Sequence, residues 1–131
     1  MRLVFVLVVF ASFGAGAQAQ QIDCANALTQ LDMTDCAKQD FDAADTALNE
    51  SYQAAMEMMY SIDADLPYAD QGAVEALKAA QRAWILVRDN TCIAEGFSWA
   101  GGSGRGMVEL SCMARLTKSR TDDLNILAEP Y

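Results

Sequence analysis

The sequence predicts an all-α fold, an antiparallel three-helix bundle with one long first helix and two disulfides. After residue 19 the chain is rich in Ala, Leu, Met, Gln and Glu, which favour helices, and stretches typical of strands are nearly absent. The two prolines stand at positions 67 and 130, and six of the eight glycines lie at or after Gly72, so long segments run without a helix breaker. The four cysteines are an even number in a short chain, which predicts disulfides if the protein is exported.

The N-terminus predicts export. Arg2 precedes the uncharged residues 3–13, a run shorter than the roughly 20 apolar residues of a membrane span but typical of a signal peptide. Cleavage is expected after Ala17 or Ala19, and we favour Ala19, which leaves residues 20–131 as one helical domain. An N-terminal core strand or helix is the disfavoured alternative. Residues 21–23 before Cys24 are not the small residues of a lipidation site, so we expect a periplasmic or secreted protein whose mature form has no membrane anchor.

Net charge and composition exclude several functions. Removal of residues 1–19 takes away Arg2 and no acid, which leaves eight basic and eighteen acidic residues and a net charge of −10. This balance disfavours nucleic acid and anionic membranes and favours a cationic partner, although acid can also serve solubility alone. The chain has no histidine, no C-x-x-C pair and no G-x-S-x-G. We therefore expect no enzyme, no cofactor and no zinc site.

Helical periodicity defines the first helix. It is expected from Thr29, an N-cap with Asp32 in the first turn, to near Ser61, before Pro67. Its apolar stripe comprises Leu31, Phe41, Ala44, Leu48, Tyr52, Ala55 and Met59.

Two shorter helices follow. The second is expected over residues 73–94, with Asp70 as its cap and Gly96 as its stop. Its stripe comprises Leu77, Gln81, Trp84, Ile85, Arg88 and Cys92. The third is expected over residues 107–128, with Val108, Cys112, Leu116, Arg120, Leu124 and Leu127 on one side. Short links make the bundle antiparallel, up-down-up.

This topology collects all four cysteines at one pole of the bundle. Three pairings remain open. Cys92 and Cys112 stand near the facing ends of adjacent helices, and Cys36 points away from the first helix's core stripe toward the segment that holds Cys24. We favour Cys24–Cys36 and Cys92–Cys112, each worth roughly 2–4 kcal/mol.

Six residues on or beside the apolar stripes are interpreted as a structural polar core. They are Asp45, Asn49, Gln81, Trp84, Arg88 and Arg120. Buried charges need partners, so we predict an Asp45–Arg120 ion pair covered by Trp84, with Asn49 and Gln81 hydrogen-bonded nearby. A catalytic carboxylate is the alternative, disfavoured because these residues stand in mid-helix.

Several motifs together resemble the lysozyme inhibitor LprI-like family. They are Asp45-x-x-Leu48-Asn49-x-x-Tyr52, Ala80-Gln81-Arg82-Ala83-Trp84-Ile85-x-x-Arg88-Asp89-x-x-Cys92, Gly101-Gly102-Ser103 and Cys112-x-x-x-Leu116-Thr117-x-x-Arg120-x-x-x-Leu124. The resemblance covers residues 24–127 of this bacterial exported family. It implies an exported protein-binding domain that inhibits lysozyme-type glycosidases, as a lipid-anchored member does. This chain departs from the anchored members because it lacks their lipidation cysteine.

The glycine-rich 96–106 loop is the expected partner-binding element. Its candidate contact residues are Phe97, Trp99, Gly101, Gly102, Ser103 and Arg105. Aromatic side chains are frequent anchors in interfaces, although here they can also simply cap the core. Two other functions stay open: an envelope structural or interaction protein without inhibitory activity, and a periplasmic copper module on Met56, Met58 and Met59, residues that more often fill core gaps.

Overall fold

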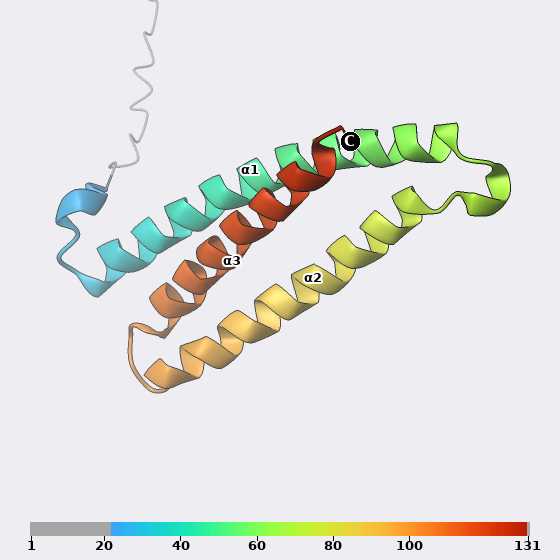
Figure 1. Cartoon of the computed structure of the whole chain (residues 1–131). Coiled ribbons are helices and arrows are strands. Elements are labelled where there is room, and N and C mark those ends of the chain that lie inside the picture. The colour runs from blue at the N-terminus through green and yellow to red at the C-terminus, as the bar shows by residue number, and fades with distance from the viewer. Residues whose placement is uncertain (1–21, 131) are drawn as a thin grey trace, which may run out of the picture.

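The computed structural model describes residues 22–130, so the predicted export signal and its cleavage site lie outside the described part. Three helices form the fold: α1 (Gln30–Asp65), α2 (Ala73–Gly96) and α3 (Arg105–Ala128). Short 3-10 turns precede or link them: η1 (Cys24–Asn26), η2 (Tyr68–Asp70) and η3 (Phe97–Trp99). Each long helix reverses the direction of the one before it (Figure 1). The predicted antiparallel three-helix bundle with a long first helix is confirmed.

The three helices pack unequally. α1 has 36 residues, or about 54 Å, whereas α2 and α3 have 24 each, or about 36 Å. α3 packs most extensively on α1, and α2 makes fewer contacts with either. The last part of α1 therefore extends past the end of α3, and α2 lies apart from the closely packed pair of α1 and α3 (Figure 1). Over residues 22–130 no helix combines the length and apolar character needed to cross a membrane.

The core follows the predicted stripes, with two exceptions. Leu48, Ala55, Leu77 and Leu124 form the buried cluster, and Met56, Met59 and Trp84 pack against it. Leu31, predicted to be buried, is 70% exposed. Its neighbour Gln30 faces α3 instead, with Nε2 3.6 Å from the sulfur of Met107, and one residue further along a helix turns the side chain by about 100°.

The second exception is Ile85, which is 38% exposed. It lines a groove of about 310 Å³ between α1 and α2, together with Leu48 and Tyr52. This groove remains open because α2 diverges from α1 (Figure 1).

The helix ends confirm one predicted cap and correct another. Thr29 caps α1 in a reciprocal capping box with Asp32, as predicted. Asp70 does not cap α2, since it lies in η2 and Gly72 occupies the N-cap. The backbone amides of Gly72, Ala73 and Val74 instead donate to the carboxylate of Asp63 in α1. The three N···O distances are 2.8, 2.9 and 3.1 Å. α1 continues four residues beyond its predicted end at Ser61, and this extension contains Asp63.

Candidate functional site

Both disulfides lie at one end of the bundle, which we call the pole. Cys24 pairs with Cys36 and Cys92 with Cys112, with Cα atoms 5.6 and 5.4 Å apart. The favoured pairing is confirmed. Cys92 and Cys112 are 0% and 1% exposed, so this bridge joins the end of α2 to the start of α3 beneath the 96–106 loop. The loop thus has a covalently fixed base.

Glycines allow the 96–106 loop to pack closely on itself. A Cβ at Gly104 would lie 2.8 Å from Cε3 of Trp99, and one at Gly96 would lie 2.5 Å from Cγ of Glu109. Gly101 adopts φ +81°, a left-handed conformation that side chains disfavour. The Gly102 amide donates to the Trp99 carbonyl at 3.0 Å. These contacts fix the Trp99 ring across the glycine turn.

The two loop aromatics are exposed but held in place. Phe97 is 59% and Trp99 50% exposed, and neither belongs to the buried cluster. The Arg105 guanidinium lies 4.4 Å from the centroid of the Phe97 ring, a cation–π contact. Its Nε also donates to Glu109 Oε1 at 2.7 Å. The chain of contacts from Gly96 through Glu109 and Arg105 therefore orients Phe97.

The remaining predicted loop residues surround the two aromatics. Gly101, Gly102 and Ser103 are exposed at the tip, and the Arg105 side chain is 40% exposed in the first turn of α3. Sequence reasoning did not identify Glu109 or Gly104 as supports. The i,i+4 spacing of Arg105 and Glu109 was a signal that could have indicated this ion pair.

Other exposed apolar side chains extend the pole surface. Leu28 is 88% and Leu31 70% exposed at the start of α1. The contact of Gln30 with Met107 places this start beside the first turn of α3. Asp23, the N-cap residue of η1, has a pKa lowered by hydrogen bonds from the Asn26 side chain and the Ala25 amide. The pole thus combines apolar side chains with a stably ionised carboxylate.

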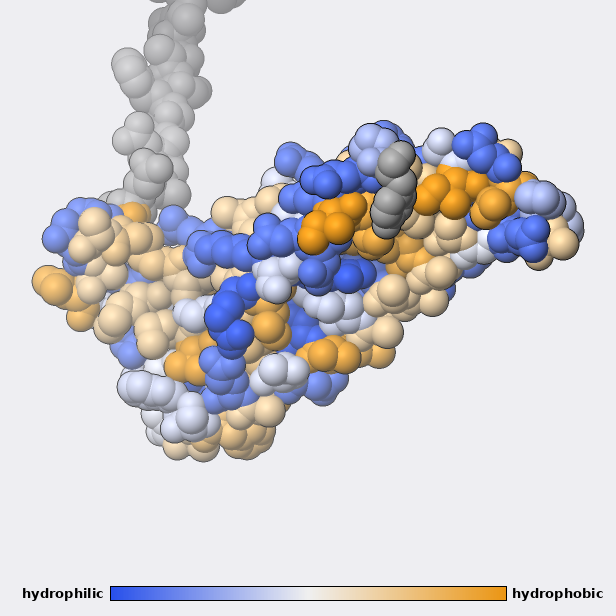
Figure 2. All heavy atoms as spheres, viewed as in Figure 1, coloured by the Kyte–Doolittle hydropathy of each residue, from blue (hydrophilic) through white to orange (hydrophobic). Residues whose placement is uncertain are grey.

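Negative charge is concentrated on α1. This helix carries nine carboxylates and one lysine, a net charge of −8. α2 has three acidic and three basic residues and is neutral, and α3 has four basic and three acidic residues. Figure 2 shows hydrophilic residues along much of the surface over α1 and α3. A cationic partner would therefore be attracted chiefly toward α1.

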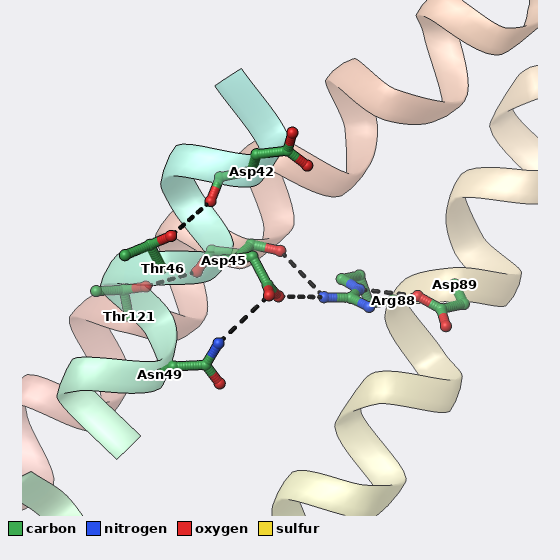
Figure 3. Close-up of polar contacts among 8 residues, drawn as sticks. Asp42, Asp45, Thr46, Asn49, Arg88, Asp89 and Thr121 are labelled. Carbon is green, nitrogen blue, oxygen red and sulfur yellow. Dashed lines mark hydrogen bonds and ion pairs between the residues drawn. The ribbon is translucent and has the colours of Figure 1, made fainter. Parts of the chain in front are cut away.

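A second polar cluster centres on Arg88 of α2, whose side chain is only 10% exposed (Figure 3). Its Nε donates to Asp89 at 2.8 Å, and its Nη1 lies 3.6 Å from Asp45 of α1. Nη1 also donates to the buried hydroxyl of Thr117 on α3, at 3.4 Å. The guanidinium lies 5.3 Å from the Phe41 ring centroid and 5.1 Å from that of Trp84. Arg88 therefore connects all three helices.

The predicted Asp45–Arg120 ion pair is wrong. Asp45 faces Arg88, whereas Arg120 donates from Nε to Gln81 Oε1 at 3.1 Å and lies 3.9 Å from Asp123. The prediction assumed that Cys36 and Cys92 lie at the same level of the bundle. Asp45 instead contacts Arg88, which stands four residues beyond Trp84 along α2 and whose guanidinium lies 5.1 Å from the centroid of the Trp84 ring.

The other members of the predicted polar core differ in burial. Gln81 is 8% and Arg88 9% exposed, and Trp84 is partly buried. Asn49 is exposed, however, and donates to Asp45 at 3.3 Å from the surface (Figure 3). Thr117 and Phe41 were not singled out beforehand as partners of Arg88. The cluster's charges are paired across helices, an arrangement that supports packing.

Metal ligation has little support in the described part of the chain. Over residues 22–130 no group of three or more His, Cys, Asp or Glu side chains is placed to hold a metal ion. Met56 and Met59, two of the three residues of the copper hypothesis, pack against the buried cluster. Their placement is that of gap-filling core residues.

Comparison with known proteins agrees with this fold. Residues 23–124 match the family described as lysozyme inhibitor LprI. An uncharacterised protein of Rhizobium meliloti (strain 1021) is 44% identical over 118 residues, which cover 88% of this chain and 85% of the relative. The crystal structure of a DUF1311 family protein from Pseudomonas putida KT2440 is similar in fold, with a TM-score of 0.67 and 23% identity over 79% of this chain and 97% of that one. The chain belongs to the lysozyme inhibitor LprI family.

Proposed function

We propose that this protein is an exported binding domain that inhibits lysozyme-type glycosidases by inserting the 96–106 loop into the enzyme's cleft. The observation that carries the proposal is the pair of half-exposed aromatic residues, Phe97 and Trp99, on a loop fixed by a disulfide and close glycine contacts. Membership of the LprI family supports the choice of target. The protein acts by binding and not by catalysis.

Rigidity of the loop favours tight binding. A loop already held in its bound shape loses little conformational freedom on association, so more of the contact energy contributes to affinity. Tryptophan and arginine are enriched among residues that dominate binding energy. Trp99, locked over Gly104, and Arg105, locked between Phe97 and Glu109, both meet this description.

Arg105 suits the chemistry of the target cleft. Most glycosidases of this class cleave with a pair of carboxylates that flank the bond. A guanidinium binds a carboxylate with charge-assisted hydrogen bonds. The 40% exposed Arg105 side chain is positioned behind Phe97 to make such a contact as the aromatic residues enter the cleft.

The acidic α1 helix assists association. Many lysozymes are strongly cationic, and a net charge of −8 on one helix attracts them over a distance set by the salt concentration. Export brings the inhibitor to the compartment where such enzymes act. The two disulfides support this location because they persist in oxidising compartments.

An inhibition assay tests the proposal. The purified protein in micromolar excess should slow peptidoglycan cleavage by at least one of several lysozyme types. Trp99→Ala and Phe97→Ala should each raise the inhibition constant about tenfold or more, as for anchor residues. Tyr68→Ala is the matched control, because Tyr68 is a 91% exposed aromatic residue in η2, far from the pole.

Salt dependence separates steering from anchoring. Raising the salt concentration should lower the association rate and leave the dissociation rate nearly unchanged. Full activity of every lysozyme type at micromolar excess of the protein would refute the inhibitory role. Inhibition that Trp99→Ala and Tyr68→Ala weaken equally would refute the loop as its site.

A further inference from the structure

The outer side of α2 forms an uncharged stripe that no other element covers. Its residues recur at steps of three and four: Ala76, Ala79, Ala83, Leu86, Asn90 and Ile93. All six are exposed, and Leu86 is 65% and Ile93 42% exposed. The opposite side of α2 holds the buried residues Leu77, Arg88 and Cys92. Figure 2 shows mostly tan and orange spheres along the outer edge of α2.

The spacing of this α2 stripe is that of a coiled-coil seam. Alternating steps of three and four keep one narrow face directed at a partner helix, as positions a and d do in heptads. The only polar member, Asn90, donates its side-chain amide to the Leu86 carbonyl at 2.8 Å and so presents little unsatisfied polarity. α2 carries equal numbers of acidic and basic residues. Two α2 helices therefore do not repel each other as two α1 helices, each with a net charge of −8, would.

We propose that two copies of the chain associate through the α2 stripe, with their α2 helices antiparallel about a two-fold axis. The stripe is self-complementary in size, with alanines in its first half and larger residues in its second half. In an antiparallel pair, positions a and d of one helix meet d and a of the other. The resulting layers pair Ile93 with Ala76, Asn90 with Ala79, and Leu86 with Ala83 of the second copy.

The flanking charges agree with the same register. Residues just before the a positions face their own counterparts in an antiparallel pair, and here they include Arg82 and Asp89. Arg82 of each copy then lies opposite Asp89 of the other, which gives two ion pairs by symmetry. Arg82 forms no ion pair within residues 22–130, and Asp89 is 40% exposed beside Arg88. A parallel pair would instead place the alanine halves against each other and leave gaps.

The size of the stripe predicts a weak dimer. From Ala76 to Ile93 it extends about 27 Å, the length of one small helix–helix contact. Interfaces of this extent bury less area than stable protein pairs and belong to the weak, transient class. We therefore expect a dissociation constant of tens of micromolar.

Sedimentation velocity tests the proposal. The full chain is expressed, exported and purified with both disulfides formed. Between about 1 and 500 µM, a range that brackets the expected constant, the mass should rise toward twice that of the monomer. Leu86→Glu should raise the dissociation constant about tenfold or more. Ile126→Glu is the matched control, because Ile126 on α3 is 64% exposed and lies outside the stripe.

A charge reversal tests the register. Arg82→Asp places a carboxylate opposite Asp89 of the second copy at each of the two symmetric positions, so it should also weaken the dimer, and less so at high salt. Circular dichroism verifies that each variant stays folded. A chain that is monomeric over the whole range, or dimerisation that Leu86→Glu and Ile126→Glu affect equally, would overturn the proposal. Dimerisation lost in Leu86→Glu but unchanged in Arg82→Asp would overturn the antiparallel register.

Discussion

Arg88→Ala should destabilise the bundle more than the loss of any other single ion pair. The side chain is 10% exposed and reaches Asp45, Thr117 and two aromatic rings. Loss of the donor to the fully buried Thr117 hydroxyl costs about 1–2 kcal/mol. The two cation–π contacts contribute about 1 kcal/mol each, and the buried stem of the side chain about 1 kcal/mol more. Asp45 adds little because its side chain is 45% exposed.

These contributions predict a loss of about 4–5 kcal/mol in the free energy of unfolding, a large share of the stability of a small domain. Urea denaturation followed by far-UV circular dichroism, under non-reducing conditions and at low micromolar protein, measures this difference. Arg115→Ala is the control, because the Arg115–Glu95 pair is shorter, at 2.7 Å, but 60% and 44% exposed. It should cost at most about 1 kcal/mol.

A double-mutant cycle with Thr117→Val isolates the interhelical hydrogen bond. The coupling between Arg88 and Thr117 should be about 1 kcal/mol, since the bond is long at 3.4 Å but shielded from water. If Arg88→Ala lost no more stability than Arg115→Ala, burial would not make the contacts of Arg88 more stabilising than an exposed ion pair. The interpretation of Arg88 as the connection between the helices would then be wrong.

Three further predictions concern the helix junctions and the pole. Asp63→Asn should lower the urea midpoint, because hydrogen bonds from the Gly72, Val74 and Ala73 amides lower the pKa of this carboxyl below its ordinary 3.8. The stabilising effect is complete above that ordinary pKa and is lost as the pH falls through the lower folded-state pKa, so the two proteins should converge only at a pH under 3.8 in a urea–pH series. Gly104→Ala should displace the Trp99 ring, since its Cβ would lie 2.8 Å from Cε3, and should change tryptophan fluorescence, whereas Gly102→Ala, with its nearest neighbour at 3.4 Å, should not. Replacement of Cys92 and Cys112 by serine should cost about 2–4 kcal/mol in calorimetry or urea unfolding.

Features that depend on local sequence could be predicted. The capping box of Thr29 and Asp32 needs only a spacing of three residues, and it forms as expected. The pairing of Cys92 with Cys112 was favoured over two alternatives because both residues stand near the facing ends of adjacent helices, and it forms. Both features depend on residues of one helix or of adjacent helix ends, where periodicity and chain connectivity restrict the geometry strongly.

Features that depend on the relative level of two helices could not be predicted. Asp45 was assigned to Arg120 instead of Arg88 because a sequence does not specify how far α1 is shifted along α2. A long arginine side chain tolerates such shifts, so several partners satisfy the same stripe. The Asp63 cap has the same origin, since its three amides lie nine to eleven residues further along, beyond the α1–α2 turn.

Charge is distributed unevenly, so different parts of the bundle present different surfaces to partners. α1 carries a net charge of −8, so its outer surface resists self-association and attracts cations. α2 is neutral and carries the uncharged stripe, and the pole carries the exposed aromatic residues. In the proposed antiparallel dimer the two poles lie at opposite ends, which leaves both 96–106 loops free. Dimerisation and inhibition should therefore be separable: Leu86→Glu should inhibit a sensitive lysozyme as well as the wild type does, and Trp99→Ala should dimerise normally.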